Sequence, residues 1–233
     1  MRISGIQKTT LLDYPWKVAC IIFTTGCNMR CKFCYNSNFV LPEKIRDIKD
    51  FIPEEIFFNF LQWRKWLLDG VVICWGEPTI QKDLIDFCQK IKNMWFLVKL
   101  DTNGSNPAIL HQLMNKKLVD YIAMDIKFDF SEKANDLLWI KLDKIMYLKS
   151  IKYILESEID YEFRTTLIKQ YHNFDNFKTI LHYIRWSKRY SLQNYRSWNT
   201  LDDRFQGKSF SYKELSDFQT LASKYVKNCI IRI

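Results

Sequence analysis

The sequence predicts an α/β fold in which short parallel strands alternate with helices. Apolar runs of strand length recur along the chain, and amphipathic stretches of helical period separate them. The expected strands lie at residues 18–24, 71–74, 96–101, 121–125, 161–167 and 190–195. Such alternation gives right-handed crossovers, and six units are too few to close an eight-stranded barrel. We therefore expect a partial (β/α)6 TIM-like barrel, with its chemistry at the carboxyl ends of the strands.

The helices are predicted from turn signals followed by apolar residues three and four positions apart. Five of them are expected to start at Pro53, at a Thr79 cap and at Asn106–Pro107, or to cover 148–155 and 174–184. Ser211 and Glu214 form a capping box. This box predicts a last helix over about 211–226.

Composition favours one globular domain over residues 1–233. The chain is 48% hydrophobic and 26% charged, and it contains no repeat or low-complexity linker, which suits a full core. The longest apolar run, 18–23, is far shorter than the roughly 20 residues that cross a bilayer, and the N-terminus lacks a signal-peptide core. We expect a cytoplasmic protein without a membrane partner.

The net charge of +9 comes from basic residues that are scattered along the chain. The longest clusters, Lys116–Lys117 and Lys188–Arg189, are too short to form a binding tract. We therefore expect a solvated surface and no direct nucleic-acid partner.

Three of the seven cysteines lie in the loop after the first predicted strand, at 25–37. Cys27, Cys31 and Cys34 have the spacing C-x3-C-x2-C, which suits metal ligation in a reducing compartment. A closed zinc or iron–sulfur site needs four protein ligands, so three thiolates leave one metal position open. The alternative is a zinc site with a distant fourth ligand, but the three histidines lie away from the predicted strand ends.

The segment GCNMRCKFCYN, residues 26–36, resembles the signature of the radical S-adenosylmethionine (SAM) superfamily. The resemblance implies a barrel of the radical SAM type and a [4Fe-4S] cluster on Cys27, Cys31 and Cys34. In that family the open iron chelates the amino and carboxylate groups of SAM. The resemblance also implies that Phe33 packs beside the adenine and that Tyr35 makes a backbone contact to it.

Trp75-Gly76-Glu77-Pro78 resembles the superfamily's Gly-Gly-Glu-Pro element, which holds the SAM ammonium group. The resemblance makes Glu77 the charge partner of that group. Trp75 departs from the pattern, because the family has glycine where the backbone must approach the cofactor. An indole at this position would fill the methionine pocket.

Asp101-Thr102-Asn103-Gly104 and Met124-Asp125-Ile126-Lys127 resemble segments of glycyl-radical-enzyme activating proteins that surround the SAM carboxylate. The resemblance implies Asp101, Thr102 and Asp125 as ligands of a small monovalent cation bridging to that carboxylate, with Lys127 offsetting charge. Two convergent carboxylates suit a hard cation. The alternative is that each aspartate merely caps the next helix.

Arg164, in the segment EFRTT, could reach the carboxylate or ribose of SAM, and a structural salt bridge is the alternative. Together with TTLLDYP at 9–15 and SLQNYR at 191–196, these motifs resemble anaerobic ribonucleoside-triphosphate reductase activating proteins over about residues 5–225. The resemblance implies an oxidoreductase that cleaves SAM to methionine and a 5′-deoxyadenosyl radical. That radical takes hydrogen from a glycine Cα of the reductase.

The partners implied by this resemblance are the large subunit of the reductase and an electron donor such as flavodoxin or ferredoxin. Activation of another glycyl radical enzyme, such as a formate-lyase type, and modification of a peptide are the alternative activities. If Trp75 is genuine, a third alternative is an inactive relative that binds a cluster without cleaving SAM.

Glycine and tryptophan are out of balance, with 6 glycines and 8 tryptophans where roughly 7% glycine would give about 16. We hypothesise that UGA codons read as glycine by the source organism are rendered as tryptophan here. The positions concerned are Trp16, Trp66, Trp75, Trp95, Trp139, Trp186 and Trp198. Trp63, on its helix, stays tryptophan. Genuine divergence is the alternative.

Overall fold

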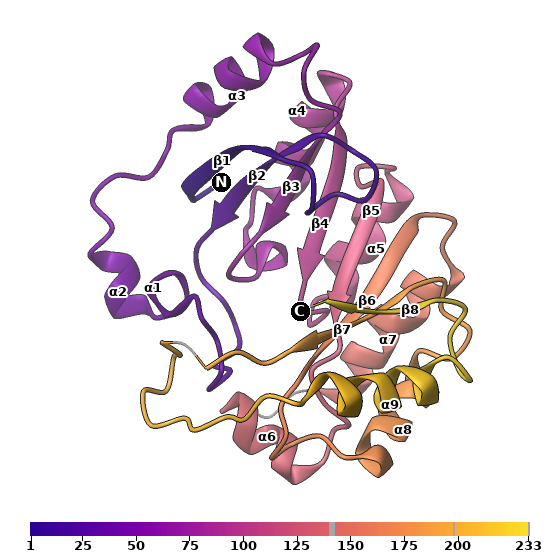
Figure 1. Cartoon of the computed structure of the whole chain (residues 1–233). Helices are drawn as coiled ribbons and strands as arrows, with labels where there is room; N and C mark the ends of the chain where they lie inside the picture. The colour runs from indigo at the N-terminus through magenta and orange to yellow at the C-terminus, as the bar shows by residue number, and fades with distance from the viewer. Residues whose placement is uncertain (140–142, 198, 233) are drawn as a thin grey trace.

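The protein is built on one sheet of eight strands, which follow one another across the sheet in chain order (Figure 1). The computed structural model describes residues 1–139, 143–197 and 199–232. The strands are β1 (Ile3–Thr10), β2 (Ala19–Thr24), β3 (Gly70–Cys74), β4 (Leu97–Thr102), β5 (Tyr121–Asp125), β6 (Asp160–Leu167), β7 (Tyr190–Asn194) and β8 (Cys229–Arg232).

Strands β2 to β8 are parallel, and β1 pairs antiparallel with β2. Within the described residues β1 and β8 are the two edges of the sheet. The sheet is therefore an open, partial barrel, and the predicted fold class is confirmed.

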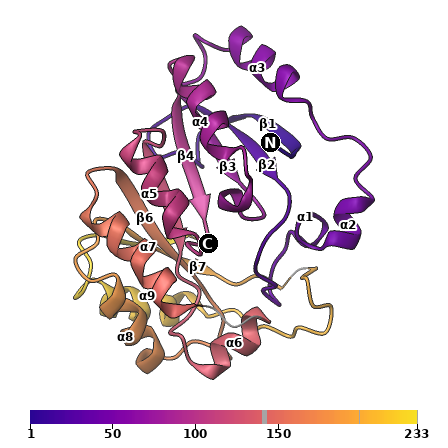
Figure 2. The same ribbon diagram turned by 180° about the vertical axis from the view of Figure 1, so that it is seen from behind.

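Helices connect the parallel strands. They are α1 (Ser37–Val40), α2 (Pro42–Arg46), α3 (Glu54–Trp63), α4 (Leu84–Asn93), α5 (Pro107–Asn115), α6 (Glu132–Leu138), α7 (Lys144–Glu156), α8 (Phe174–Tyr183) and α9 (Tyr212–Ala222), with the 3-10 helix η1 at Pro78–Ile80. Seen from behind in Figure 2, α4, α5 and α7 lie in front of the strands and cover one face of the sheet. The capping box that begins α9 is confirmed.

Both faces of the sheet are buried, which explains why its strands are continuously apolar rather than alternating. On β2, Cys20 and Ile22 belong to the large core between sheet and helices. Ala19 and Ile21 point the other way, into a smaller cluster inside the barrel that includes Tyr121. The inner cluster contains far fewer residues than the outer core, and the inner face keeps room for a cavity at the carboxyl ends of the strands.

Several elements differ from the predictions. Thr79 does not cap α4, which begins at Leu84 after Asp83, because the Thr79 amide and hydroxyl both bond to Glu77 and close the separate turn η1. Strand β1 was not predicted because Gln7 and its polar neighbours face solvent at the sheet edge. The four-residue strand β8 and helices α1, α2 and α6 were also missed, and α9 is shorter than predicted.

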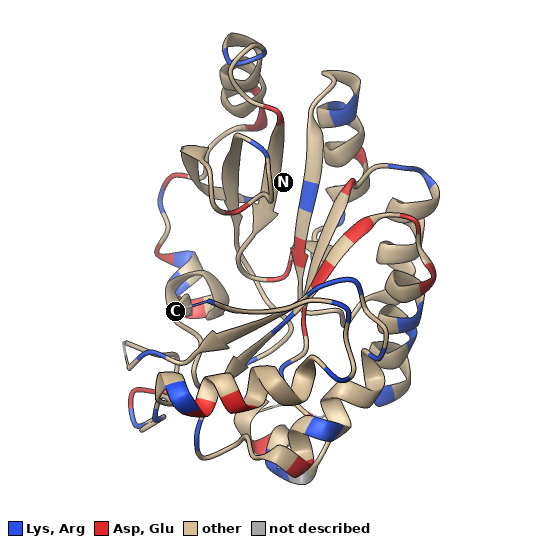
Figure 3. Ribbon diagram, turned by 45° about the vertical axis from the view of Figure 1, so that its right-hand side comes forward, with Lys and Arg blue, Asp and Glu red and all other residues tan. Residues whose placement is uncertain are grey.

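No helix in the described part of the chain is long and apolar enough to cross a membrane. Figure 3 shows the lysines and arginines distributed over several helices and loops. Acidic residues also lie on the central strands, and two of them, Asp101 on β4 and Asp125 on β5, line a cavity at the carboxyl ends of the strands. The site is built around these interior charges.

Candidate functional site

A cavity of about 660 Å³ lies at the carboxyl ends of the strands. Its volume is within the range of small-molecule sites, roughly 300–1,000 Å³. The predicted site residues that line it are Cys27, Cys31, Phe33, Cys34, Tyr35, Trp75, Gly76, Asp101, Thr102, Asn103, Asp125, Lys127 and Arg164. The structure therefore brings the motifs of five separate loops and strands to one place. Glu77 and Pro78 do not line the cavity.

The cysteine loop is held by backbone hydrogen bonds to segments far away in the sequence. The Lys32 amide donates to the Leu137 carbonyl at 2.9 Å, which joins the loop to α6. The amides of Leu201 and Asp202 donate to the carbonyls of Cys34 and Lys32 at 2.8 and 3.1 Å. The loop is thus fixed by main-chain contacts on both sides.

The three cysteine thiols face the cavity from a desolvated position. Burial raises the pKa of Cys27 to about 11 and that of Cys31 to about 12. No three His, Cys, Asp or Glu side chains of the described residues are grouped as ligands of a single metal ion. An iron–sulfur cluster would be held by cysteine thiolates. The loop therefore has the donor type and number that such a cluster needs.

Two aromatic residues of the same loop have different surroundings. Phe33 is buried and belongs to the main core, so it gives this side of the cavity an apolar wall. Tyr35 is more exposed, and its hydroxyl donates to the Arg196 carbonyl at 2.7 Å and accepts from the Arg196 amide at 2.8 Å. Tyr35 thereby joins the cysteine loop to the end of β7.

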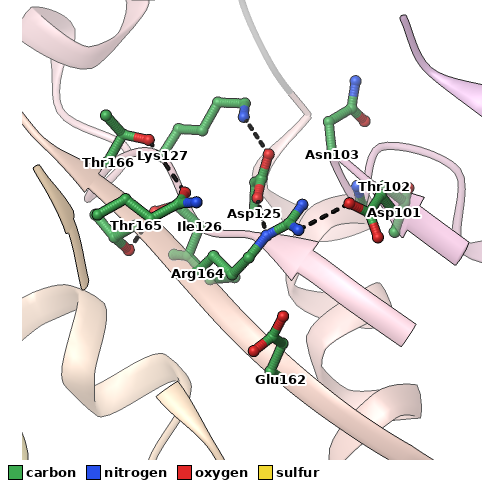
Figure 4. Close-up of polar contacts among 12 residues, drawn as sticks. Asp101, Thr102, Asn103, Asp125, Ile126, Lys127, Glu162, Arg164, Thr165 and Thr166 are labelled. Carbon is green, nitrogen blue, oxygen red and sulfur yellow. Dashed lines mark hydrogen bonds and ion pairs between the residues drawn. The ribbon is translucent and has the colours of Figure 1, made fainter. Parts of the chain in front are cut away.

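The opposite side of the cavity is a chain of alternating charges (Figure 4). The Arg164 guanidinium donates to Asp101 and to Asp125, each at 2.8 Å. Lys127 Nζ donates to the other oxygen of Asp125 at 2.7 Å, and Lys99 donates to the other oxygen of Asp101. The two carboxylates, which lie on β4 and β5, are therefore bridged by one arginine from β6.

This network keeps its carboxylates ionised. Burial would raise the pKa of Asp125, but the charges of Arg164 and Lys127 outweigh it and hold the pKa well below its usual range. The pKa of Asp101 is lowered in the same way, with Arg164 and Lys99 overcoming the effect of burial. Conversely, Asp125 raises the pKa of Lys127 against the effect of burial.

The three residues predicted to bind a monovalent cation already have partners within the protein. Asp101 and Asp125 each accept from two basic side chains, and the Thr102 hydroxyl donates to Glu77 at 2.7 Å. Of the two roles considered for Arg164, the structure contains the salt bridge. The small monovalent cation stays a prediction.

Glu77 is fully buried behind the cavity, where it joins the loops after β3 and β4. Its carboxylate accepts from the Thr79 amide at 3.1 Å, the Thr102 hydroxyl at 2.7 Å and the Asn103 amide at 2.6 Å. Burial raises its pKa, although these hydrogen bonds oppose the shift. Its contacts are those of a residue that positions Thr102 and Asn103.

Gly76 allows the loop after β3 to approach the cysteine loop. Its φ is +54°, and a Cβ at this position would lie 2.2 Å from the Gly26 carbonyl oxygen. The same carbonyl accepts from the Glu77 amide at 2.8 Å. Only glycine fits this close contact.

Comparison with known proteins agrees with this geometry. The family model described as the radical SAM superfamily matches residues 21–184. The chain belongs to the radical SAM superfamily. A protein of Methanocaldococcus jannaschii, named as a candidate glycyl-radical enzyme activating enzyme, is 32% identical over 238 residues, covering 99% of this chain and 95% of the relative. This match places the radical SAM chain in the glycyl-radical enzyme activating family.

Two further matches are more distant. The pyruvate formate-lyase-activating enzyme of Listeria monocytogenes is 27% identical over 135 residues, covering 54% of this chain and 53% of the relative. The crystal structure of Streptococcus suis SuiB bound to S-adenosylmethionine superposes with a TM-score of 0.68 at 16% identity, covering 91% of this chain and 52% of that chain. The second match concerns the fold alone. Membership of the radical SAM superfamily implies an iron–sulfur cluster and SAM.

Some residues of this radical SAM site were missed by sequence reasoning. Lys99 is buried in the apolar strand β4, and a lone lysine in such a strand is a signal that could have identified it. Gln193, Asn194 and Arg196 line the cavity from the end of β7. They lie in the SLQNYR segment. Polar residues at the end of this strand could have identified them, as the polar residues at the ends of β4 and β5 did for Asp101 and Asp125. Arg232, from the unpredicted β8, also lines the cavity.

Proposed function

We propose that this radical SAM protein is an activating enzyme that installs a glycyl radical in anaerobic ribonucleoside-triphosphate reductase. The observation that carries the proposal is a single cavity with three thiols on one side and an ion-paired carboxylate network on the other. A relative named as a candidate activating enzyme, matched over 95% of its length, supports the activity. The resemblance of the motifs over nearly the whole chain supports the reductase as substrate.

Cys27, Cys31 and Cys34 are proposed to hold a [4Fe-4S] cluster. Three protein thiolates leave one metal position for another ligand, which suits chelation of SAM. When bound, the cluster supplies the electron for reductive cleavage of SAM.

The chain's own residues would bind and orient the cofactor. Phe33 contributes an apolar wall that keeps water from a reactive radical. Lys127 lines the cavity, and its ammonium group has three donors, of which one bonds to Asp125. It is therefore placed to hold the carboxylate of an amino-acid ligand. Arg164, fixed between Asp101 and Asp125, keeps the strand ends in one geometry.

The proposed partners follow from the same reaction. The reductase would present its glycine to the cavity, and flavodoxin or ferredoxin would supply the electron. All seven cysteines are free, which suits a reducing compartment such as the cytoplasm.

The proposal is tested with protein reconstituted anaerobically with iron and sulfide. Incubation with SAM and dithionite is expected to release 5′-deoxyadenosine, measured by chromatography. Adding the reductase from the same organism is expected to give a glycyl radical signal in electron paramagnetic resonance. The control is Cys31→Ala, which should give neither product.

The outcomes separate the alternatives. A radical on a formate-lyase type enzyme but not on the reductase would replace the proposed substrate. A normal iron–sulfur spectrum without 5′-deoxyadenosine would support the inactive relative.

A further inference from the structure

The tryptophans are concentrated at backbone positions that favour glycine. Seven non-glycine residues in the described part of the chain have positive φ, and five of them are tryptophans, although only 8 of 233 residues are tryptophan. The left-handed region is unfavourable for any residue with a Cβ. These residues are Trp16 (φ 63°), Trp75 (φ 64°), Trp95 (φ 70°), Trp139 (φ 51°) and Trp186 (φ 67°).

Trp95 occupies the glycine position of a helix end. It directly follows Met94, the C-cap of α4. The Trp95 amide donates to the Lys92 carbonyl at 2.9 Å, and the Phe96 amide donates to the Ile91 carbonyl at 3.4 Å. These two hydrogen bonds define a Schellman motif, in which the left-handed residue is usually glycine. The indole gains little in return, because Trp95 is 86% exposed.

Trp16 occupies the glycine position of a turn. The Lys17 amide donates to the Tyr14 carbonyl at 3.2 Å, which closes a four-residue turn with Pro15 second and Trp16 third. Proline second and positive φ third define a type II turn, which favours glycine at its third position. Trp16 is 90% exposed, so no packing explains a large side chain there.

Trp139 and Trp186 also follow helices. Trp139 is the left-handed C-cap of α6. Trp186 lies two residues after Ile184, the C-cap of α8, and its amide donates to the Tyr225 carbonyl at 2.8 Å. The Trp139 amide donates to the Asp136 carbonyl at 3.4 Å. Each indole lies under one basic side chain, Lys32 at 5.5 Å from the Trp139 ring and Arg185 at 4.8 Å from the Trp186 ring. Such contacts at exposed sites are worth only about 0.5–1 kcal/mol.

Trp75 differs because its side chain lies in the site. Its ring stacks on Phe23 at 3.9 Å between centroids and contacts Phe39 at 4.8 Å. It lines the same cavity as the three cysteines, immediately before Gly76. Removing this indole would enlarge the cavity without breaking a hydrogen bond, because Trp75 bonds to Thr24 through its backbone carbonyl.

We propose that glycine occupies positions 16, 75, 95, 139 and 186 in the polypeptide as its cell makes it, and that glycine at 75 opens the cavity. A codon read as glycine in the cell but written as tryptophan in this sequence would produce the pattern. Trp63, which ends α3 without a positive φ, stays tryptophan. Trp66 does not have a positive φ, so its backbone gives no reason to assign glycine there. Trp198 lies outside the described residues.

The first test is peptide mass spectrometry of the protein purified from its source cells. Peptides covering the five positions are expected to contain glycine, and the peptide with position 63 is expected to contain tryptophan. Tryptophan at any of the five positions would overturn the proposal. This readout does not depend on the activity of the protein.

A second test compares the stability of recombinant chains. Changing the four exposed tryptophans together, with Trp16→Gly, Trp95→Gly, Trp139→Gly and Trp186→Gly, is expected to raise the Tm by on the order of 10 °C. Position 75 is left out because the Trp75 ring packs on Phe23 and Phe39. The matched control is Trp63→Gly, which should lower the Tm because glycine is unfavourable in a helix. A lower Tm for the four-residue variant would contradict the backbone argument.

The effect at position 75 is measured by equilibrium binding of SAM to reconstituted protein, and this part rests on the proposed function. Trp75→Gly is expected to bind SAM at least about tenfold more tightly than the chain with tryptophan at position 75, a difference of about 1.4 kcal/mol. Equal affinity would overturn the role of position 75. If neither chain binds SAM while the native peptides contain glycine, the proposed function fails and the glycine assignment stands.

Discussion

The two sides of the cavity are held in place by different means. On the cysteine side, backbone hydrogen bonds join the loop to residues after β7 and in α6. Cys31 is buried with apolar Phe33, and the other two cysteines are partly buried. On the strand side, Asp101, Asp125 and Arg164 hold one another through ion pairs. The cysteine side thus depends on loop geometry, and the strand side on charge balance.

This difference matches the chemistry proposed for each side. A cluster needs thiols that are free to bind metal, and a loop fixed by its main chain leaves all three side chains available. A polar ligand such as SAM needs charged groups that do not move when it binds. Paired charges on rigid strands are held in that way. Substitutions on the two sides should therefore have different kinds of effect.

The largest effect is expected on the cysteine side. Cys31→Ala removes one of the three proposed cluster ligands, so iron content and 5′-deoxyadenosine formation should both fall to background. Iron analysis and visible absorption of the reconstituted protein measure this. Cys88→Ala, in the core face of α4, is the control and should retain iron. Full iron content and SAM cleavage in Cys31→Ala would disprove the ligand assignment.

On the strand side, Arg164→Met should cost stability. It leaves Asp101 and Asp125 with one basic partner each, and the expected loss in the free energy of unfolding is about 3–4 kcal/mol. Urea denaturation of the protein without cluster measures it. Lys152→Met breaks an exposed pair with Glu156 and should change stability by less than about 0.5 kcal/mol. Equal losses for both variants would refute the network's importance.

The ion-pair network and His172 should respond differently to acid. Burial lowers the pKa of His172 to about 4 from its usual 6.5, so the unfolded chain binds more protons between these values. Stability is therefore full above about pH 6.5 and should fall by about 3 kcal/mol as the pH drops to about 4. The network carboxylates, with lowered pKa values, stay ionised over this range.

His172→Gln should flatten this pH dependence, measured as the free energy of unfolding against pH. The exposed His182→Gln variant should keep the slope of the original chain. An unchanged slope in His172→Gln would assign the acid sensitivity to another group.

The smallest effect is expected for Tyr35, an exposed residue of the cysteine loop. Tyr35→Phe removes both hydrogen bonds between its hydroxyl and Arg196. Because Tyr35 is partly exposed, the expected loss is about 1 kcal/mol, measured by thermal unfolding. Iron content should be unchanged. A loss of iron would mean that the β7 contact also fixes the cysteine loop.

The sequence predicted the parts of this molecule that depend on local pattern. All six internal parallel strands were found, because each is a short apolar run bounded by turns. The edge strands β1 and β8 were not, because a polar edge strand and a four-residue strand give weak periodicity. The Thr79 cap was wrong because the carboxylate of Glu77, two residues earlier in the same loop, accepts from the Thr79 amide and hydroxyl and makes Thr79 part of η1.

The cysteine motif and the order of strands and helices were determined by the sequence itself, since spacing and periodicity act over a few residues. Only the tertiary structure decided that Arg164 bridges Asp101 and Asp125, that Lys99 completes this network and that Glu77 lies behind the cavity. These roles depend on which strands become neighbours and on how deeply each charge is buried. The tryptophans connect both levels: their number is unusual in the sequence, but only the backbone of the folded chain distinguishes the five positions that favour glycine from Trp63.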